Sequence, residues 1–139
     1  MSSDFINKYF NNFSELLKNI DFETLNKAIQ ILKDLKTKNG RLFILGVGGS
    51  AGNASHSVND FRKLCNIETY TPTDNVSEIT ARTNDEGFET IFEEYLKVSK
   101  LNEGDVLLIY SVGGGNESLN ISTNLVSAIK YAKKTNSKI

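Results

Sequence analysis

Two short runs of apolar residues, each followed by glycines, constrain the fold of this chain most strongly. The first run, residues 42–45, precedes the turn Gly46-Val47-Gly48-Gly49-Ser50, and the second, within residues 105–112, precedes Gly113-Gly114-Gly115. Continuous apolar runs of this length are typical of strands that are buried on both faces of a parallel sheet. The sequence therefore predicts an α/β fold in which two strands end in glycine-rich turns.

Helical periodicity fills the rest of the chain. Two amphipathic helices are predicted ahead of the first strand, with Asp21 capping the second helix and Asn39-Gly40 ending it. The predicted helices cover residues 5–20, 25–35, 50–65, 75–83, 88–99 and 120–135. One further strand is predicted over residues 67–73, and another is predicted to begin at residue 137. This alternation predicts a three-layer, doubly wound, mostly parallel sheet of flavodoxin-like type, which binds ligands beyond the carboxyl ends of its strands.

The chain is predicted to form one domain over residues 1–139, with N-terminal helices in residues 1–39 and the sheet-forming part in residues 40–139. A length of 139 residues suits a single core, and no repeat or low-complexity linker divides it. Because the last three residues read as the start of a strand, we expect an incomplete sheet and a chain truncated at its C-terminus.

Composition disfavours several kinds of partner. Sixteen Lys and Arg against seventeen Asp and Glu give a formal net charge of −1, and no basic stripe is present, so nucleic acid is not expected as a partner. The apolar segments are far shorter than the ~20 residues that cross a bilayer, and the N-terminus lacks a signal-peptide pattern, so no membrane partner is expected. The single cysteine, Cys65, cannot form an internal disulfide, and the cytoplasm is the expected compartment.

The first glycine-rich turn, residues 46–50, has the properties of an anion site. Its glycines permit a tight turn, and the N–H groups that open the next helix point with the helix dipole toward an anion such as phosphate. Close packing of strand against helix is the other explanation of these glycines. With Ala51 the turn also matches a dinucleotide-binding pattern, but Glu68, the carboxylate near the required spacing, precedes the second strand instead of ending it. A Rossmann-like dinucleotide domain is therefore the runner-up interpretation of this turn.

Asn53, His56 and Asp60 follow this turn at spacings of three and four residues, so they project from one face of the predicted helix. A histidine followed at this spacing by a carboxylate suits a base with an orienting partner, or two ligands of a divalent metal. A surface ion pair is the alternative interpretation. Because metal sites commonly take three or four protein ligands, any metal here needs further groups from elsewhere.

The second glycine-rich turn follows Ser111 and is another candidate phosphate site. Backbone N–H groups around Gly113 can form a nest for phosphate oxygens, and the hydroxyls of Ser118, Ser122 and Thr123 add neutral donors. A flexible surface loop is the alternative interpretation. Both turns are predicted to lie at the carboxyl edge of the sheet.

Together these features resemble, in order and spacing over nearly the whole chain, the bacterial phosphoheptose isomerases of the SIS (sugar isomerase) family. The residues that carry the resemblance are the turn at 46–50 with its flanking strand and helix, His56, residues 74–78, residues 84–88 and the strand ending at Ser111. It implies an SIS fold that interconverts sedoheptulose 7-phosphate and D-glycero-D-manno-heptose 7-phosphate for the heptose of surface glycans, lipopolysaccharide or capsule. It also implies a homotetramer and, in some members, bound zinc.

The same resemblance assigns roles to individual residues. His56 and Asp60 would flank the reacting carbons as catalytic residues and would be the available zinc ligands. The residues that would bind the substrate and its phosphate are Gly48, Gly49, Ser50, Asn53, Asp85, Ser111, Gly113, Ser118, Ser122 and Thr123.

The chain departs from the family pattern at three points. Asp60 replaces the family's catalytic glutamate, which sets the carboxylate back by ~1 Å and can cost roughly a hundredfold in rate. The phosphate loop has three glycines and extra residues in place of Ser and Thr. The family's second catalytic residue, a histidine in the C-terminal third, has no counterpart before Ile139. A non-catalytic phosphosugar-binding SIS module is therefore a second hypothesis.

Overall fold

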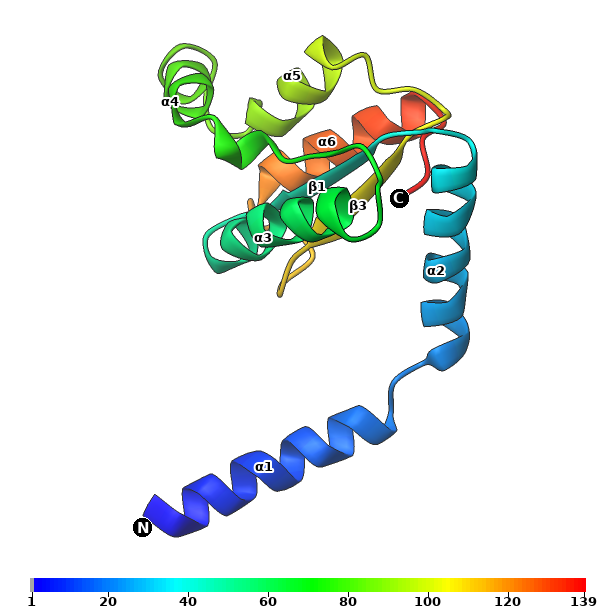
Figure 1. Cartoon of the computed structure of the whole chain (residues 1–139). Coiled ribbons are helices and arrows are strands. Elements are labelled where there is room, and N and C mark those ends of the chain that lie inside the picture. The colour runs from blue at the N-terminus through cyan, green and yellow to red at the C-terminus, as the bar shows by residue number, and fades with distance from the viewer. Residues whose placement is uncertain (1) are drawn as a thin grey trace. The chain divides into compact units, whose positions relative to one another are not determined.

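The computed structural model describes residues 2–139 (Figure 1). The chain divides into two compact units, one extending to Leu32 and the other covering Lys33–Ile139. The first unit contains helix α1 (Ser2–Lys18) and most of helix α2 (Phe22–Thr37). Among the described residues, no helix has both the length and the apolar character needed to cross a membrane.

Helix α2 has the predicted cap. The Asp21 carboxylate accepts hydrogen bonds from the backbone N–H groups of Glu23 and Thr24, each at 3.0 Å. The hydroxyl of Thr24 also donates to it, and this hydrogen bond is the largest of the effects that lower the pKa of Asp21. A negative charge at this position is favourable because it faces the positive end of the helix dipole.

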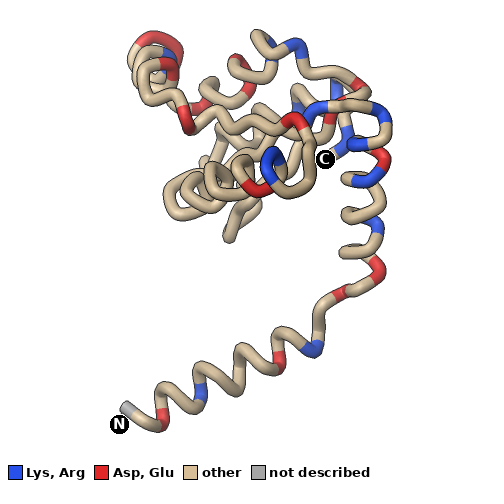
Figure 2. The backbone as a smooth tube through the Cα atoms, viewed as in Figure 1, with Lys and Arg blue, Asp and Glu red and all other residues tan. Residues whose placement is uncertain are grey.

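Helix α1 exposes the apolar stripe that its sequence predicts. Figure 2 shows that charged residues are sparse along this helix. The exposed apolar side chains of the stripe are Phe5, Ile6, Tyr9, Phe10, Phe13, Leu16 and Leu17. An amphipathic stripe of this kind is stable in water when it packs against another apolar surface.

The second unit is built on three parallel strands in the order β2-β1-β3. Its elements are β1 (Leu42–Gly46), α3 (Gly49–Lys63), β2 (Thr69–Tyr70), the 3-10 helix η1 (Pro72–Asp74), α4 (Val76–Asp85), α5 (Ile91–Val98), β3 (Val106–Tyr110) and α6 (Thr123–Lys134). Lys138 forms a parallel bridge with Val106, on the side where a further strand would pair. The predicted doubly wound α/β fold with a parallel sheet is confirmed.

Helices cover both faces of the sheet. Strand side chains alternate between faces, so Phe43, Leu45 and Leu107 share one face, where they form the core with Leu96 of α5 and Leu125 of α6. Helix α3 packs on the opposite face, and Figure 1 shows α3 and α6 on either side of the strands. This layering gives strand β1 five buried residues, as its apolar run requires.

The second strand is shorter than predicted. We expected a strand over residues 67–73, but only Thr69–Tyr70 pairs with β1. Pro72 has no backbone N–H to donate to a sheet and opens η1 instead, while Asn66 has a left-handed backbone with φ of 53° ahead of the strand. The chain therefore leaves the sheet after Tyr70.

A buried ion pair aligns the beginnings of β1 and β3. Arg41 donates from Nη2 to Asp105 at 2.7 Å and from Nε at 3.1 Å, and its backbone N–H donates to the same carboxylate at 3.1 Å. These side-chain hydrogen bonds are the main effect that raises the pKa of Arg41. This ion pair lies where the two strands begin, and the pairing then runs in register from Leu42 with Val106. At the carboxyl ends of the strands, Gly46 is therefore paired with Tyr110.

Candidate functional site

The turn after β1 requires glycine at two positions. A Cβ atom on Gly46 would lie 2.4 Å from the backbone oxygen of Ser50, so the strand can approach the helix this closely only without a side chain. Gly48 has φ of 60°, a left-handed backbone that favours glycine. Part of this turn is thus explained by the close packing of β1 against α3.

The hydrogen bonds of this turn change what it offers to an anion. The backbone N–H groups of Ser50 and Ala51 donate to the carbonyls of Val47 and Gly48, at 3.2 and 3.0 Å. The N–H group of Gly52 also donates to Gly48, at 3.3 Å. The expected row of free amides is therefore partly occupied in this conformation. Among the described residues, the N–H groups of Gly48 and Gly49 form no such backbone hydrogen bond, so these two groups and the side-chain hydroxyl of Ser50 remain as donors.

The two glycine-rich turns meet in one hollow, which we call the loop depression. It has a volume of about 230 Å³. Its lining residues are Val47, Ser50, Tyr110, Ser111, Val112, Gly113, Ser122 and Leu125. Four predicted binding residues are thus brought together from three parts of the chain, at the carboxyl ends of β1 and β3. Hydroxyl groups and one wall of apolar side chains suit an uncharged or anionic polar ligand.

The second turn is held by its own hydrogen bonds. Gly114 has φ of 74°, and its N–H group donates to the side-chain oxygen of Ser111 at 3.0 Å. Beyond it, Asn116 and Ile121 exchange two backbone hydrogen bonds of 2.8 Å, which closes a small loop between them. Ser122 follows with a left-handed backbone at φ of 47° and forms no side-chain cap on α6.

A second hollow lies beside α3, and we call it the helix depression. It has a volume of about 340 Å³ and is lined by Asn53, His56, Ser57 and Tyr110. His56 Nε2 lies 3.4 Å from Asp60 Oδ2, with 79% of the histidine side chain and 45% of the aspartate side chain exposed. The predicted face of α3 is therefore formed. His56 lines the depression, and Asp60 does not line it but contacts His56. An exposed pair of this kind adds little to stability.

Tyr110 joins the two hollows and was missed by the sequence interpretation. Its side chain lines both depressions, and its hydroxyl lies 3.0 Å from the hydroxyl of Ser57. Two signals could have identified this pair. Tyr110 directly precedes Ser111 at a strand end, and Ser57 stands four residues after Asn53, on the face already assigned to the site.

Other predicted binding residues lie outside both depressions. Asp85 ends α4, is exposed and accepts a hydrogen bond of 2.8 Å from its neighbour Asn84. Ser118 is exposed at the far end of the small loop, and Thr123 is the first residue of α6. Gly48 and Gly49 shape the first turn without lining either hollow.

The available metal ligands do not suit a zinc site by themselves. His56 and Asp60 are the two side chains that could share an ion. Within residues 2–139 no group of three or more His, Cys, Asp or Glu side chains lies close enough to hold a metal. Since structural and catalytic zinc sites use at least three protein ligands, the residues described here do not complete one.

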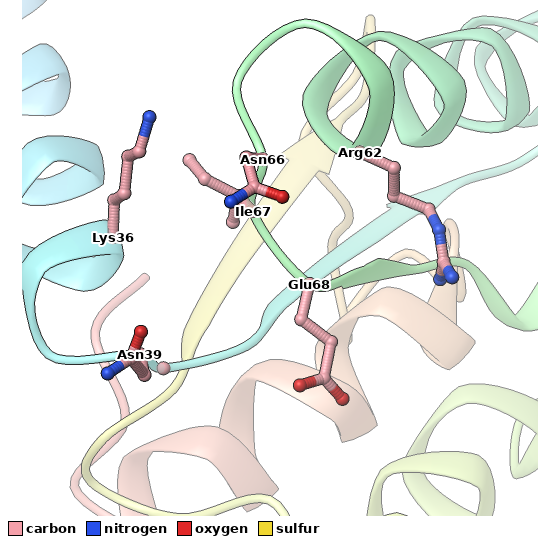
Figure 3. Close-up of a pocket in the computed structure, with 7 residues that line it drawn as sticks. Lys36, Asn39, Arg62, Asn66, Ile67 and Glu68 are labelled. Atoms are coloured by element: carbon pink, nitrogen blue, oxygen red, sulfur yellow. The ribbon is translucent and has the colours of Figure 1, made fainter.

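A third hollow, of about 320 Å³, lies at the opposite edge of the sheet (Figure 3). Figure 3 shows that Lys36 extends in the opposite direction to Arg62 and Glu68. Tyr70 donates to Glu68 at 2.7 Å, which raises the pKa of the Tyr70 phenol, and Arg62 donates to the carbonyl of Thr69 at 3.0 Å. Arg62 and Glu68 are thus engaged in contacts within the fold, and Lys36 does not converge with them, so the hollow lacks the converging polar groups of a ligand site.

The position of Glu68 also bears on the dinucleotide alternative. Its backbone oxygen accepts from the N–H group of Leu42 at 2.8 Å, which places Glu68 beside the beginning of β1. The glycine-rich turn is at the other end of that strand. A carboxylate that binds a ribose lies on the same side as the glycines, so the structure gives this alternative no support.

Comparison with known proteins agrees with this geometry. The family model described as "SIS domain" matches residues 8–139. The chain is 32% identical over 118 residues to the lincomycin biosynthesis protein LmbN of Streptomyces lincolnensis, which covers 81% of this chain and 42% of that protein. It is 33% identical over 131 residues to a phosphoheptose isomerase of Campylobacter jejuni, which covers 88% of this chain and 63% of that protein. The chain thus spans less than two thirds of the length of these relatives.

Solved structures show the same fold. A phosphoheptose isomerase from Neisseria gonorrhoeae aligns with a TM-score of 0.82 at 23% identity, over 99% of this chain and 72% of that one. One from Francisella tularensis aligns with a TM-score of 0.79 at 25% identity, over 99% of this chain and 71% of that one. The family resemblance seen in the sequence is confirmed: the chain belongs to the SIS domain family.

Proposed function

We propose that the protein is a phosphosugar isomerase that interconverts sedoheptulose 7-phosphate and D-glycero-D-manno-heptose 7-phosphate. The relatives named phosphoheptose isomerase support this substrate, and the family supports a phosphorylated sugar as the class of ligand. The cytoplasmic location expected from the sequence belongs to the same proposal, as does a role in the synthesis of surface-glycan heptose.

One observation carries the proposal: the loop depression and the helix depression are adjacent and share Tyr110. The first offers the hydroxyls of Ser50, Ser111 and Ser122 to a phosphate group. The second presents His56, with Asp60 beside it, where a carbonyl carbon would react. An extended sugar phosphate has this same order of groups, with a phosphate at one end and a carbonyl at the other.

The chemistry assigned to Asp60 is proton abstraction. Its carboxylate removes the proton from the carbon next to the carbonyl, the electron pair forms a carbon–carbon double bond, and the carbonyl oxygen gains a proton to give an enediol. A proton is then returned to the former carbonyl carbon while the hydroxyl on the neighbouring carbon loses its proton and becomes the new carbonyl. His56, 3.4 Å away, orients the carboxylate. Phosphate held in the loop depression anchors the substrate and contributes binding energy remote from the reacting carbons.

The described residues supply one side of this acid–base pair. His56 is the single histidine of the sequence and is assigned to orient Asp60, so the described residues leave no second histidine for the other proton transfer. The proposal therefore assigns the second proton transfer to a group outside the described residues, such as one from a neighbouring copy of the chain. No step of the reaction is assigned to zinc.

A phosphosugar-binding module without turnover is the second candidate function. The observation that favours it is Asp60 itself, whose carboxylate is one methylene shorter than the family's glutamate. Its side chain is 45% exposed, so water still competes with a substrate for this carboxylate. Such a module would use the loop depression in the same way and would leave the sugar unchanged.

Binding and turnover of sedoheptulose 7-phosphate separate the two candidates. We expect the sugar phosphate, at a hundred times its dissociation constant, to raise the free energy of unfolding by about 2.7 kcal/mol and to be converted to the aldose. Thermal unfolding measures the first effect, and a chromatographic assay of the product measures the second. Stabilisation without product would identify the binding module, and NAD as the only stabilising ligand would refute both candidates.

We also propose that the protein forms a homo-oligomer, specifically a tetramer. The support is the exposed apolar stripe of α1, in which half or more of the side chains of Phe5, Tyr9 and Phe13 remain accessible to solvent. Exposed apolar surface on this scale marks an association site. A second copy of the same helix offers a matching apolar surface.

Light scattering tests this assembly. We expect a mass of four chains at micromolar concentration, and a lower mass for Phe13→Glu, because a charge in the stripe is costly to bury. Asn11→Glu, which adds the same charge on the helix face opposite the stripe, should leave the mass unchanged. A monomeric wild-type protein would refute the assembly.

A further inference from the structure

The side chain of Tyr110 has a defined place in the layered fold. Tyr110 is the last residue of β3 and pairs with Gly46, the last residue of β1. Paired residues of neighbouring strands point to the same face of a sheet, and Gly46 has no side chain to occupy that face. The phenol therefore reaches α3, where its hydroxyl lies 3.0 Å from that of Ser57.

The two hydroxyls keep hydrogen-bonding capacity after they bind each other. Each hydroxyl carries one proton and two acceptor lone pairs, and their mutual hydrogen bond uses one proton and one lone pair. Whichever of Tyr110 and Ser57 is the donor, the pair retains one free O–H group and several lone pairs. Among the described residues, no other hydrogen bond to either hydroxyl occurs. A neutral group that both donates and accepts is the natural complement.

The location of the pair identifies that complement. Tyr110 lines both hollows, and Ser57 lines the helix depression next to His56 and Asn53. A group bound there lies between the phosphate end of an extended sugar phosphate and its reacting end. A phosphate has acceptors and few protons to donate near neutral pH, whereas a sugar hydroxyl both donates and accepts.

We propose that Tyr110 and Ser57 together bind one hydroxyl group of the sugar chain between the phosphate and the reacting carbons, and so select the substrate by the hydroxyl at that carbon. This inference rests on the proposed function, because it takes the ligand to be a sugar phosphate. It adds a specificity-determining pair to a site whose other members bind phosphate or move protons.

Tyr110→Phe and Ser57→Ala test the pair, since each removes one hydroxyl and little else. Calorimetry would measure the dissociation constants of sedoheptulose 7-phosphate and of inorganic phosphate. For each variant we expect binding of the sugar phosphate to weaken about tenfold, as for the loss of one hydrogen bond, and binding of inorganic phosphate to stay unchanged. A variant that lost packing alone would weaken both ligands and lower the unfolding temperature.

Deoxy analogues of the sugar phosphate locate the hydroxyl. We expect one analogue, which lacks a single mid-chain hydroxyl, to bind the wild-type protein about tenfold more weakly than sedoheptulose 7-phosphate does. Tyr110→Phe should bind this analogue and sedoheptulose 7-phosphate equally well, because the variant no longer contacts the missing hydroxyl. Equal losses for every analogue in both proteins would overturn the inference while leaving the proposed function intact. If the wild-type protein binds inorganic phosphate but no sugar phosphate, the proposed function fails and the inference fails with it.

Discussion

Replacing Asp60 with asparagine is expected to lower the turnover of sedoheptulose 7-phosphate by about 10²- to 10⁴-fold, which is the usual contribution of a general base. Asparagine has nearly the same shape but cannot accept the proton. The carboxylate is 45% exposed and contacts the neighbouring helix residues His56 and Asn59, at 3.4 and 3.3 Å. The unfolding temperature should therefore change little, and steady-state kinetics would measure the loss as a fall in kcat.

Two further variants sharpen this test. Glu68→Gln removes a carboxylate at the opposite edge of the sheet and should leave kcat unchanged. Asp60→Glu restores the family's side-chain length and should raise kcat, because moving the base ~1 Å toward the reacting carbon is worth up to roughly a hundredfold. Full turnover by Asp60→Asn would exclude Asp60 as the base.

Replacing Gly46 with alanine is expected to lower the free energy of unfolding by about 3 kcal/mol, at the upper end for overpacked positions. The added Cβ would lie 2.4 Å from the backbone oxygen of Ser50 and 2.5 Å from its carbonyl carbon. These are backbone atoms at the start of α3, so relief requires the helix to move away from β1. Urea unfolding followed by circular dichroism would measure the change.

Gly52→Ala is the matched control for this substitution. Gly52 lies in the first turns of the same helix, and a Cβ atom there would meet nothing within 4 Å. We expect this variant to gain about 0.5 kcal/mol, since alanine loses less conformational entropy than glycine in a helix. A Gly46→Ala protein as stable as the wild type would show that β1 and α3 do not pack as closely as described.

Local sequence patterns were sufficient to predict most of the elements. Strands β1 and β3 were predictable because a strand covered on both faces must be apolar at every position. The face of α3 that carries Asn53 and His56 was predictable as well, because helix geometry relates residues three and four apart without any other part of the chain. Strand β2 was predicted too long, since the pattern of β-rich residues does not show where pairing with β1 stops.

The composition of the candidate site was predictable in part. That both glycine-rich turns would lie at one edge of the sheet followed from the rule that parallel strands share their carboxyl ends. Ser122 lines the loop depression, whereas Ser118 does not. This difference depends on the bridge between Asn116 and Ile121, which closes the loop and places Ser118 away from the turn. Pairing within an irregular loop has no periodicity from which to predict it.

By itself, the sequence determined the order of helices and strands along the chain and the residues on the α3 face, because these depend on neighbours within a few positions. The family followed from the order and spacing of motifs over nearly the whole chain. Only the tertiary structure decided that Tyr110 and Ser57, which are 53 residues apart, meet between the two depressions. Their contact requires the register of β1 against β3 and the close approach of α3 over Gly46 at the same time. No local pattern encodes that combination, since it arises where three separate elements pack together.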